Sequence, residues 1–166
     1  MSKLPKELDS KYEVLAELRS GGMGDVFKVK HRYLDEIQVI KLMNASLTGS
    51  EDLKTRFVRE AKMAKQLRHQ NIAEVIDFSV TAYIVMEFIP GIDLRDVLTR
   101  AGKPLEWQFV ADIAVQTLTI LTFLHGKGFV HRDISPDNLM LTRRPDGTPL
   151  ITLIDLGIAK AVEGEI

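Results

Sequence analysis

Short runs of alternating hydrophobic and polar residues dominate the first half of the chain. Residues 12–18 and 26–30 alternate on either side of the glycine cluster SGGMG, and a third run, EIQVIKLM, begins at Glu36. The segments IAEVIDFSV and AYIVMEFI follow further along. Alternation with a period of two is typical of strands that bury one face, and glycine clusters favour turns. The pattern predicts five strands.

A helical period interrupts these strands after Ser50, where Glu51 and Asp52 mark a helix start. At ~100° per residue, five apolar residues fall within one arc of roughly 120°, and they are Leu53, Phe57, Ala61, Ala64 and Leu67. Helical patterns dominate from Leu94 onward, and residues 106–125 are predicted to form a long, mostly apolar, buried helix. A short strand LML, an Asp-Gly turn and the strand LITLI complete the pattern.

The break at Pro90 and Gly91 divides the chain into two predicted lobes. Residues 1–11 form an N-terminal extension, and residues 12–89 form a lobe that is mainly sheet with one helix. Residues 90–166 form a mainly helical lobe. The predicted fold class is therefore α+β.

Composition narrows the classes of function. The 166 residues are 45% hydrophobic, and 22 basic against 23 acidic residues leave a net charge of −1. Such balance gives no long-range attraction to nucleic acid or to anionic lipid. The chain has no cysteine, which excludes disulfides and thiolate metal sites. The N-terminus lacks a signal-peptide core, and the charge-free stretch 113–126 is too short to span a bilayer, so we expect a cytoplasmic domain without a membrane segment.

Two charged residues occupy positions where the patterns place apolar side chains. Glu60 lies within the apolar arc of the first helix, and Lys41 shares a strand face with Ile37 and Val39. An unpaired carboxylate in a dry site would cost on the order of several kcal/mol. Either Lys41 and Glu60 pair with each other, or each reaches water at the edge of its element. A pair would hold a cation in a defined place.

The octet HRDISPDN, at residues 131–138, sets a dense group of polar residues between the apolar runs GFV and LML. Asp133 and Asn138 lie within it, and Asp155 follows the last apolar strand in LIDLG. A triphosphate with a hard divalent cation requires oxygen ligands and a separate proton acceptor, which these three residues supply. The backbone N–H groups of GGMG favour close approach of an anion. Taken singly, a plain hairpin, a turn and a loop cap explain these features better than a nucleotide site does.

Together and in this order, the residues resemble the eukaryotic-like serine/threonine protein kinases common in bacteria, from about Tyr12 to the last residue. LRSGGMGDVF is similar to the glycine-rich loop, QVIK to the third-strand lysine motif, REA to helix C, VMEF to the hinge, HRDISPDN to the catalytic loop and DLG to the metal-binding motif. The resemblance implies a bilobal fold: a five-stranded antiparallel sheet with helix C, followed by an incomplete helical lobe.

The same resemblance implies roles for individual residues. Asp133 would accept the substrate hydroxyl proton, and Lys41 would hold the nucleotide phosphates with Glu60 as its partner. Asn138 and Asp155 would bind Mg²⁺. The residues implied to bind ATP are Leu18, Gly21, Gly22, Gly24, Val26, Val39, Lys41, Met86, Glu87, Ile89, Asp93 and Met140. The implied partner is a protein with a Ser or Thr hydroxyl, which suggests a role in signalling.

Four departures from the family pattern stand out. Arg19 occupies the first glycine position of the loop, and Ser135 stands where a lysine usually contacts the γ-phosphate. Leu156 replaces a phenylalanine in the apolar column that, by resemblance, includes His131. The chain ends at Ile166, where the activation segment would follow. We therefore expect the long helix to expose apolar surface, or to be covered by a partner or by further chain.

Three functions compete. The first is an ATP-dependent Ser/Thr protein kinase domain, with weak or no activity expected of these 166 residues alone. The second is a catalytically impaired nucleotide-binding or scaffold module, favoured by Arg19, Ser135 and the early end. The third is a small-molecule phosphotransferase, which Arg132 disfavours because those enzymes usually carry glycine at that position.

Overall fold

A five-stranded antiparallel sheet forms the first half of the computed structural model, which describes residues 4–21, 24–43, 51–80 and 83–158. The strands lie in the order β1-β2-β3-β5-β4. Their bounds are Tyr12–Gly21 for β1, Gly24–His31 for β2, Ile37–Met43 for β3, Val75–Ser79 for β4 and Tyr83–Glu87 for β5. The predicted five-stranded sheet is thus confirmed. Gly22 of the glycine cluster, the helix start at Ser50 and residues 159–166 lie outside the described residues.

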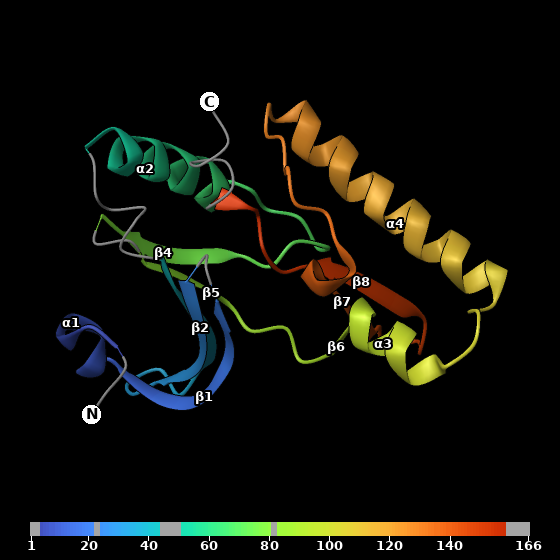
Figure 1. The fold of residues 1–166 in the computed structure, drawn as a ribbon, viewed down its shortest axis with the longest axis horizontal. Helices are drawn as coiled ribbons and strands as arrows, with labels where there is room; N and C mark the ends of the chain where they lie inside the picture. Colours follow the sequence, from blue (N-terminus) through green and yellow to red (C-terminus); the bar gives the residue numbers. More distant parts are fainter. Residues whose placement is uncertain (1–3, 22–23, 44–50, 81–82, 159–166) are drawn as a thin grey trace.

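Period-two alternation gives this sheet two buried faces. On β5, Ile84 and Met86 join the core beneath helix α2 (Glu51–Lys65), while Val85 joins a second core on the opposite face. That second core includes Leu4 and Leu8, carried by residues at and around α1 (Lys6–Asp9). Figure 1 shows α2 and α1 on opposite sides of the sheet. The N-terminal residues therefore pack on the first lobe.

Helix α2 buries the apolar arc that the sequence predicts. Phe57, Ala61 and Ala64 are buried, and Leu53 packs against the same core from a half-exposed position. Glu60, within the same arc, is half-buried. Acidic residues in the first turn and lysines in the last turn complement the helix dipole.

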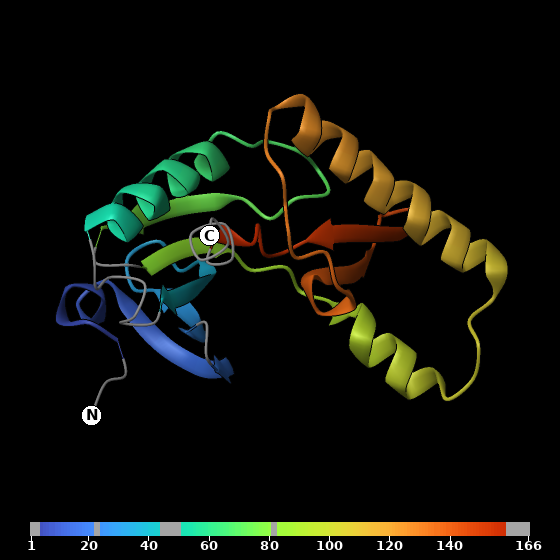
Figure 2. The same cartoon turned by 45° about the horizontal axis from the view of Figure 1, so that its top comes forward.

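The second half combines two helices with a small three-stranded sheet. The chain crosses from the first half after β5 (Figure 2) and forms β6 (Ile92–Asp93), α3 (Leu94–Ala101) and α4 (Trp107–Gly126). A short 3-10 helix, η2 (Pro136–Asn138), then leads into β7 (Leu139–Arg143) and β8 (Pro149–Leu153). These strands pair in the order β6-β7-β8. The helical elements, the LML strand and the LITLI strand thus all appear as predicted.

Helix α4 is much less buried than its composition predicts. Of its 20 residues only Gln116, Ile120 and Leu124 are buried. Trp107 and Leu118 expose 72% and 61% of their surface. The prediction of a buried helix is wrong, because one side packs toward β8 while the other meets no described segment. The exposed apolar surface expected for its outer face is present.

Helix α4 also has a length and apolar composition compatible with crossing a membrane, and within the described ranges no other helix does. Core helices of soluble proteins pass the same test.

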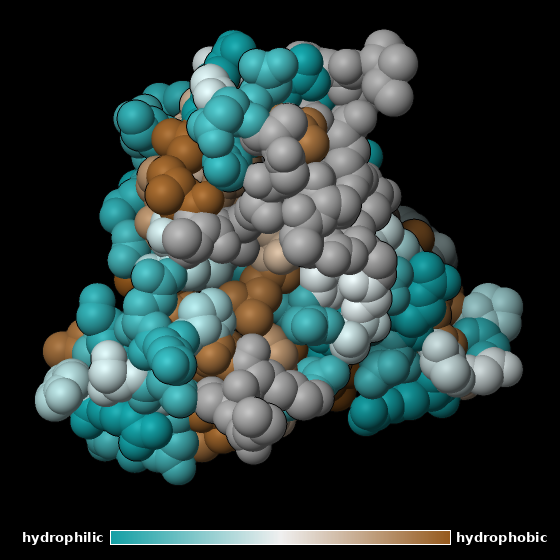
Figure 3. All heavy atoms as spheres, turned by 60° about the vertical axis from the view of Figure 1, so that its left-hand side comes forward, coloured by the Kyte–Doolittle hydropathy of each residue, from teal (hydrophilic) through white to brown (hydrophobic). Residues whose placement is uncertain are grey.

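The sheet end of the molecule looks different in Figure 3, where hydrophilic residues cover most of the visible face and hydrophobic ones show in patches between them.

One hydrophobic core continues from the first half into the second. It joins Phe57 of α2 and Met86 of β5 to Leu124 of α4, Leu153 of β8 and Leu156 beyond it. Two backbone hydrogen bonds between Ala73 and Leu153 and between Leu153 and Asn71 tie the segment before β4 to β8. These contacts join the two lobes, and a cavity lies between them.

Candidate active site in the cleft between the lobes

A cavity of about 350 Å³ lies between the two lobes and collects most of the predicted residues. Predicted nucleotide-site and metal-site residues that line it are Leu18, Val26, Val39, Lys41, Met86, Glu87, Ile89, Asp93, Asn138, Met140 and Asp155. Gly21, Gly24, Glu60 and Asp133 are described but do not line it. The cavity is also lined by residues that the sequence reasoning did not assign to nucleotide binding, namely Arg19, Lys28, Phe88, Gly91, Asp137 and Ile154.

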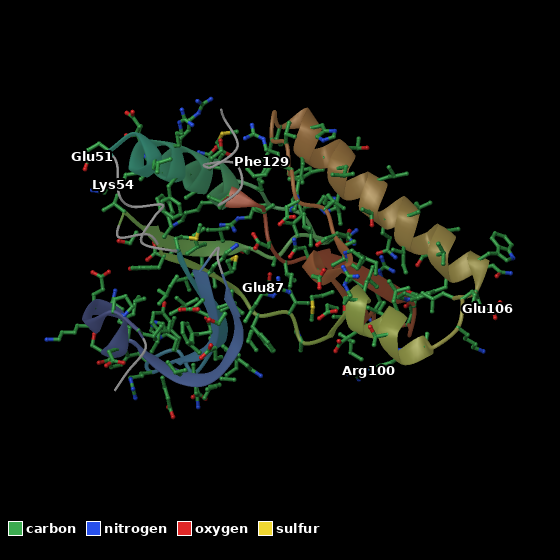
Figure 4. All side chains as sticks on the ribbon, in the orientation of Figure 1. Glu51, Lys54, Glu87, Arg100, Glu106 and Phe129 are labelled. Carbon is green, nitrogen blue, oxygen red and sulfur yellow. The ribbon has the colours of Figure 1, made fainter. Side chains whose placement is uncertain are left out.

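Strand pairing explains how the roof and back wall of this cavity form. Val26 lies opposite Lys41 across β2 and β3, and Val39 lies opposite Met86 across β3 and β5. Met140 of β7 lines the cavity from the other lobe. Figure 4 places Glu87 where the chain leaves the sheet for the second lobe. The arrangement forms an apolar slot beside a charged end, which suits a flat ring attached to an anion.

The charged end is built around an ion pair between Lys41 and Asp155. The Lys41 Nζ lies 2.5 Å from Asp155 Oδ2, although the residues are 114 positions apart in sequence. The Lys41 side chain is only 9% exposed and that of Asp155 only 22%. Burial alone would raise the pKa of Asp155, but the attraction and hydrogen bond of Lys41, with the Gly157 N–H, lower it. Asp155 is therefore ionised at neutral pH.

This pair corrects the predicted partnership of Lys41 with Glu60. No ion pair or side-chain hydrogen bond joins Glu60 to another residue in the described ranges. Asp155 comes from the second lobe and lines the same cavity as Lys41. Its carboxylate, and not that of Glu60 in α2, therefore pairs with the Lys41 ammonium group. Local periodicity identified both unusual charges correctly but could not choose between two acidic partners.

Hydrogen bonds fix the loop that contains Asp133. The Asp133 backbone N–H donates to His131 Nδ1 at 3.1 Å, so the other ring nitrogen, Nε2, carries the proton that faces the Asp155 carbonyl. His131 is buried, and burial lowers its pKa despite the opposing influence of Asp155. The neutral ring therefore acts as a structural link between the HRD and DLG segments. This agrees with its predicted packing role.

Two backbone features allow the HRD and DLG segments to lie close together. Arg132 has a φ of 62°, in the left-handed region that costs a non-glycine residue roughly 1–3 kcal/mol. Gly157 has a φ of 63°, and a Cβ there would lie 2.4 Å from the His131 carbonyl oxygen. The glycine of DLG is required because the HRD backbone passes directly beside it.

Asn138 lies buried between Asp133 and the DLG segment. Its Nδ2 donates to the Asp133 carbonyl at 3.0 Å and lies 3.4 Å from Asp133 Oδ2. The Ile154 N–H donates to the Asn138 carbonyl at 3.0 Å, which holds the neighbouring Asp155 close by. Asn138 also lines the cavity, and its Nδ2 is engaged by Asp133.

These oxygens suit a hard cation. Mg²⁺ prefers oxygen ligands, keeps several waters and commonly binds to one or two protein groups plus substrate phosphates. Asp155 and Asn138 supply such a pair. Among the described residues no three His, Asp or Glu side chains gather into a preformed metal site. The donor set therefore fits a metal that arrives with a phosphate ligand.

Asp93 and Asp137 lie at the mouth of the cleft. Asp93 caps α3 by accepting the Asp96 N–H at 2.8 Å. Asp137 pairs with Arg95, whose Nη2 lies 3.0 Å from Oδ2. The hydrogen bond from Arg95 is the main reason why the pKa of Asp137 is lowered. A separate hollow of about 510 Å³ behind the hinge shares only two residues with the predicted site, so the smaller cavity is the candidate.

Comparison with known proteins identifies the family. The model of the protein kinase domain matches residues 12–166. The chain belongs to the protein kinase domain family. The matched range includes the glycine cluster, Lys41, α2, the hinge and the HRD and DLG segments. The structure belongs to the bilobal kinase fold class.

Similar bacterial proteins are named as serine/threonine kinases. The chain is 37% identical to the serine/threonine-protein kinase pkn3 of Myxococcus xanthus, over 95% of this chain and 29% of that protein. It is 34% identical to the serine/threonine-protein kinase PknA of Mycobacterium tuberculosis, over 94% of this chain and 37% of that protein. The kinase chain thus spans about a third of the length of these relatives.

Solved kinase structures share its fold. The kinase domain of Mycobacterium tuberculosis PknI superimposes with a TM-score of 0.74 at 30% identity, covering 90% of this chain and 60% of that one. A double mutant of the same domain gives a TM-score of 0.77 at 29% identity. The chain thus covers about three fifths of the length of this solved kinase domain.

Proposed function

We propose that the cleft binds ATP with Mg²⁺ and that the chain is the nucleotide-binding part of a Ser/Thr protein kinase. The observation that carries this proposal is the convergence of Lys41, Asn138 and Asp155 on one cavity from distant segments. An apolar slot beside a lysine, an amide and a carboxylate matches a base joined to a metal-bound phosphate chain. The family membership and the names of the relatives support the same reading.

The proposed roles follow from position. Val26, Val39 and Met140 hold the adenine ring, and the hinge backbone at Glu87 and Ile89 faces its edge. Lys41 binds phosphate oxygens, while Asn138 and Asp155 hold the metal. When bound, Mg²⁺ would neutralise charge on the phosphates. These assignments place the phosphates at the charged end of the cavity.

Asp133 is proposed as the acceptor of the substrate hydroxyl proton. Its backbone is fixed by His131 and its side chain lies beside the Asn138 amide. A base must be held within hydrogen-bond reach of the hydroxyl while the γ-phosphoryl group is transferred. The acceptor would be a Ser or Thr of a protein, and the reaction would take place in the cytoplasm, where ATP is available.

Binding of Mg²⁺-ATP tests the proposal directly. At a nucleotide concentration of 100 Kd, ligand binding stabilises a folded protein by about 2.7 kcal/mol, so the melting temperature should rise measurably. Asp133→Asn should keep Mg²⁺-ATP affinity within about twofold and abolish any transfer of labelled phosphate that the chain catalyses. The absence of any calorimetric or thermal response to Mg²⁺-ATP would refute the proposal.

One specific set of observations favours a second candidate, a nucleotide-binding module without transfer. Arg19 and Ser135 depart from the usual kinase pattern at the glycine loop and at the catalytic loop. Binding that is normal in affinity, with no transfer that depends on Asp133, would select this second candidate.

A further inference from the structure

The cations that line the cleft differ in how far they are already engaged. Lys41 is hydrogen-bonded to Asp155. Lys28 lies over the Phe88 ring, with its Nζ 4.1 Å from the ring centroid. Arg19 lines the same cavity, and no hydrogen bond or ion pair joins it to another described residue. Arg19 and Lys28 are therefore the cleft cations that have no hydrogen-bond partner among the described residues, and of these two only Lys28 is engaged by an aromatic ring.

The local backbone directs Arg19 into the cleft. It lies opposite Val26, an apolar residue of the cavity roof, and the β1–β2 register shifts between Glu17 and Arg19. A bulge of this kind re-aims the side chains beside it. Arg19 accordingly lines the cavity, whereas Val14 and Leu15, earlier on the same strand, are exposed outside it.

Arg19 faces an acidic group on the floor of the cleft that is already occupied. Asp137 also lines the cavity, and the positive charge of Arg19 contributes to lowering its pKa. Arg95 holds both carboxylate oxygens, at 3.0 Å from Nη2 and 3.4 Å from Nε. Asp137 thus attracts the positive charge of Arg19 electrostatically, but no hydrogen bond or ion pair joins these two side chains in the described structure.

We propose that Arg19 is a phosphate-binding residue of this cleft, which makes the site select phosphorylated nucleotides over the bare nucleoside. This inference rests on the proposed ATP function and names a residue from the glycine-loop strand. A guanidinium offers up to five donors in a planar fork and binds phosphate oxygens in pairs. Ser135, on the catalytic loop, supplies no such charge. Arg19 supplies a positive charge from β1, at the roof of the cavity.

The inference accounts for an otherwise unfavourable residue choice. An arginine in a position that carries glycine in the resembling family fills space above the ligand. It also adds a third positive charge to a cavity that Lys28 and Lys41 already line, and like charges within one cavity repel each other. A polyanionic ligand compensates that repulsion, whereas an uncharged ligand does not.

Calorimetric titration of Mg²⁺-ATP, Mg²⁺-ADP and adenosine into three variants tests the inference. Arg19→Ala should weaken ATP and ADP binding about tenfold, equivalent to ~1.4 kcal/mol, and leave adenosine affinity within twofold. Arg19→Lys should recover most of the loss, because a charge remains. Arg100→Ala is the matched control: it removes the same charge from the exposed far end of α3 and should change no affinity (Figure 4).

Other outcomes overturn the inference in distinguishable ways. An equal loss of ATP and adenosine affinity would show that Arg19 shapes the cleft and does not contact phosphate. Unchanged or tighter ATP binding in Arg19→Ala would remove Arg19 from the phosphate site. If the unmodified chain bound neither ATP nor adenosine, the proposed function itself would fail, together with the inference that rests on it.

Discussion

The Lys41–Asp155 ion pair should contribute measurably to the stability of the ligand-free chain. Lys41→Met keeps the length of the apolar stem and removes the ammonium group. Asp155 then remains in a site where only 22% of its side chain is exposed, and the Gly157 N–H still donates a hydrogen bond to its carboxylate. Breaking a buried pair typically costs about 3–5 kcal/mol, and partial exposure reduces this to about 2–3 kcal/mol here.

A double-mutant cycle separates the pair from the individual residues. Asp155→Asn alone should cost less, about 1–2 kcal/mol, because the Lys41 stem can carry its ammonium toward water. In the double variant neither charge is left without its partner. The combined loss should therefore fall short of the sum of the single losses by about 1.5 kcal/mol or more. Urea unfolding followed by circular dichroism, without nucleotide, measures the free energy of unfolding of each variant.

The control double-mutant cycle uses Glu60, the residue that the sequence pattern suggested as the partner of Lys41. Lys41→Met combined with Glu60→Gln should be additive within about 0.5 kcal/mol, since these side chains form no ion pair in the described structure. Coupling in the Glu60 cycle together with additivity in the Asp155 cycle would refute the assignment of the Lys41 partner. It would show instead that α2 supplies the counter-charge in solution.

Two further perturbations test the fold that positions the site. Gly157→Ala should lower the free energy of unfolding by roughly 1 kcal/mol or more beyond the effect of Gly102→Ala, and urea midpoints measure the difference. Both glycines have positive φ, but only at Gly157 would a Cβ meet a carbonyl, that of His131. Ile120→Ala should cost about 2–4 kcal/mol, whereas Leu118→Gln on the exposed side of α4 should change stability by less than about 0.5 kcal/mol. Equal losses within either pair would contradict the described packing.

Much of the fold follows from signals that are local in sequence. The alternation around Ile40 and Val85 places successive side chains on opposite faces of the sheet, which holds for each strand without knowledge of its neighbours. Phe57 and Ala61 define the buried arc of α2 in the same way. The HRD and DLG segments were recognisable because their residue types and order match the kinase pattern.

Other features depend on which distant surfaces meet. The partner of Lys41 lies 114 residues away, and only the placement of the second lobe selects Asp155 over Glu60. The pairing of Arg95 with Asp137 joins α3 to the catalytic loop, and neither residue stands out in its local pattern. Helix α4 was expected to be buried because its sequence is long and mostly apolar. Composition gives its hydrophobicity, but burial depends on what packs against it.

The ligand-free cleft is electrostatically balanced by pairs that a ligand would have to exchange. Lys41 is held by Asp155, and Asp137 is held by Arg95. For Lys41 to bind a phosphate, Asp155 must receive another cation, since leaving its carboxylate without a partner in a partly buried site is costly. A phosphate and a divalent cation that enter together satisfy both halves of this pair in one step. The pairing of Lys41 with Asp155 therefore favours the proposed metal-bound nucleotide over either component alone, and Arg19 can engage such a ligand without giving up a hydrogen-bonded partner among the described residues.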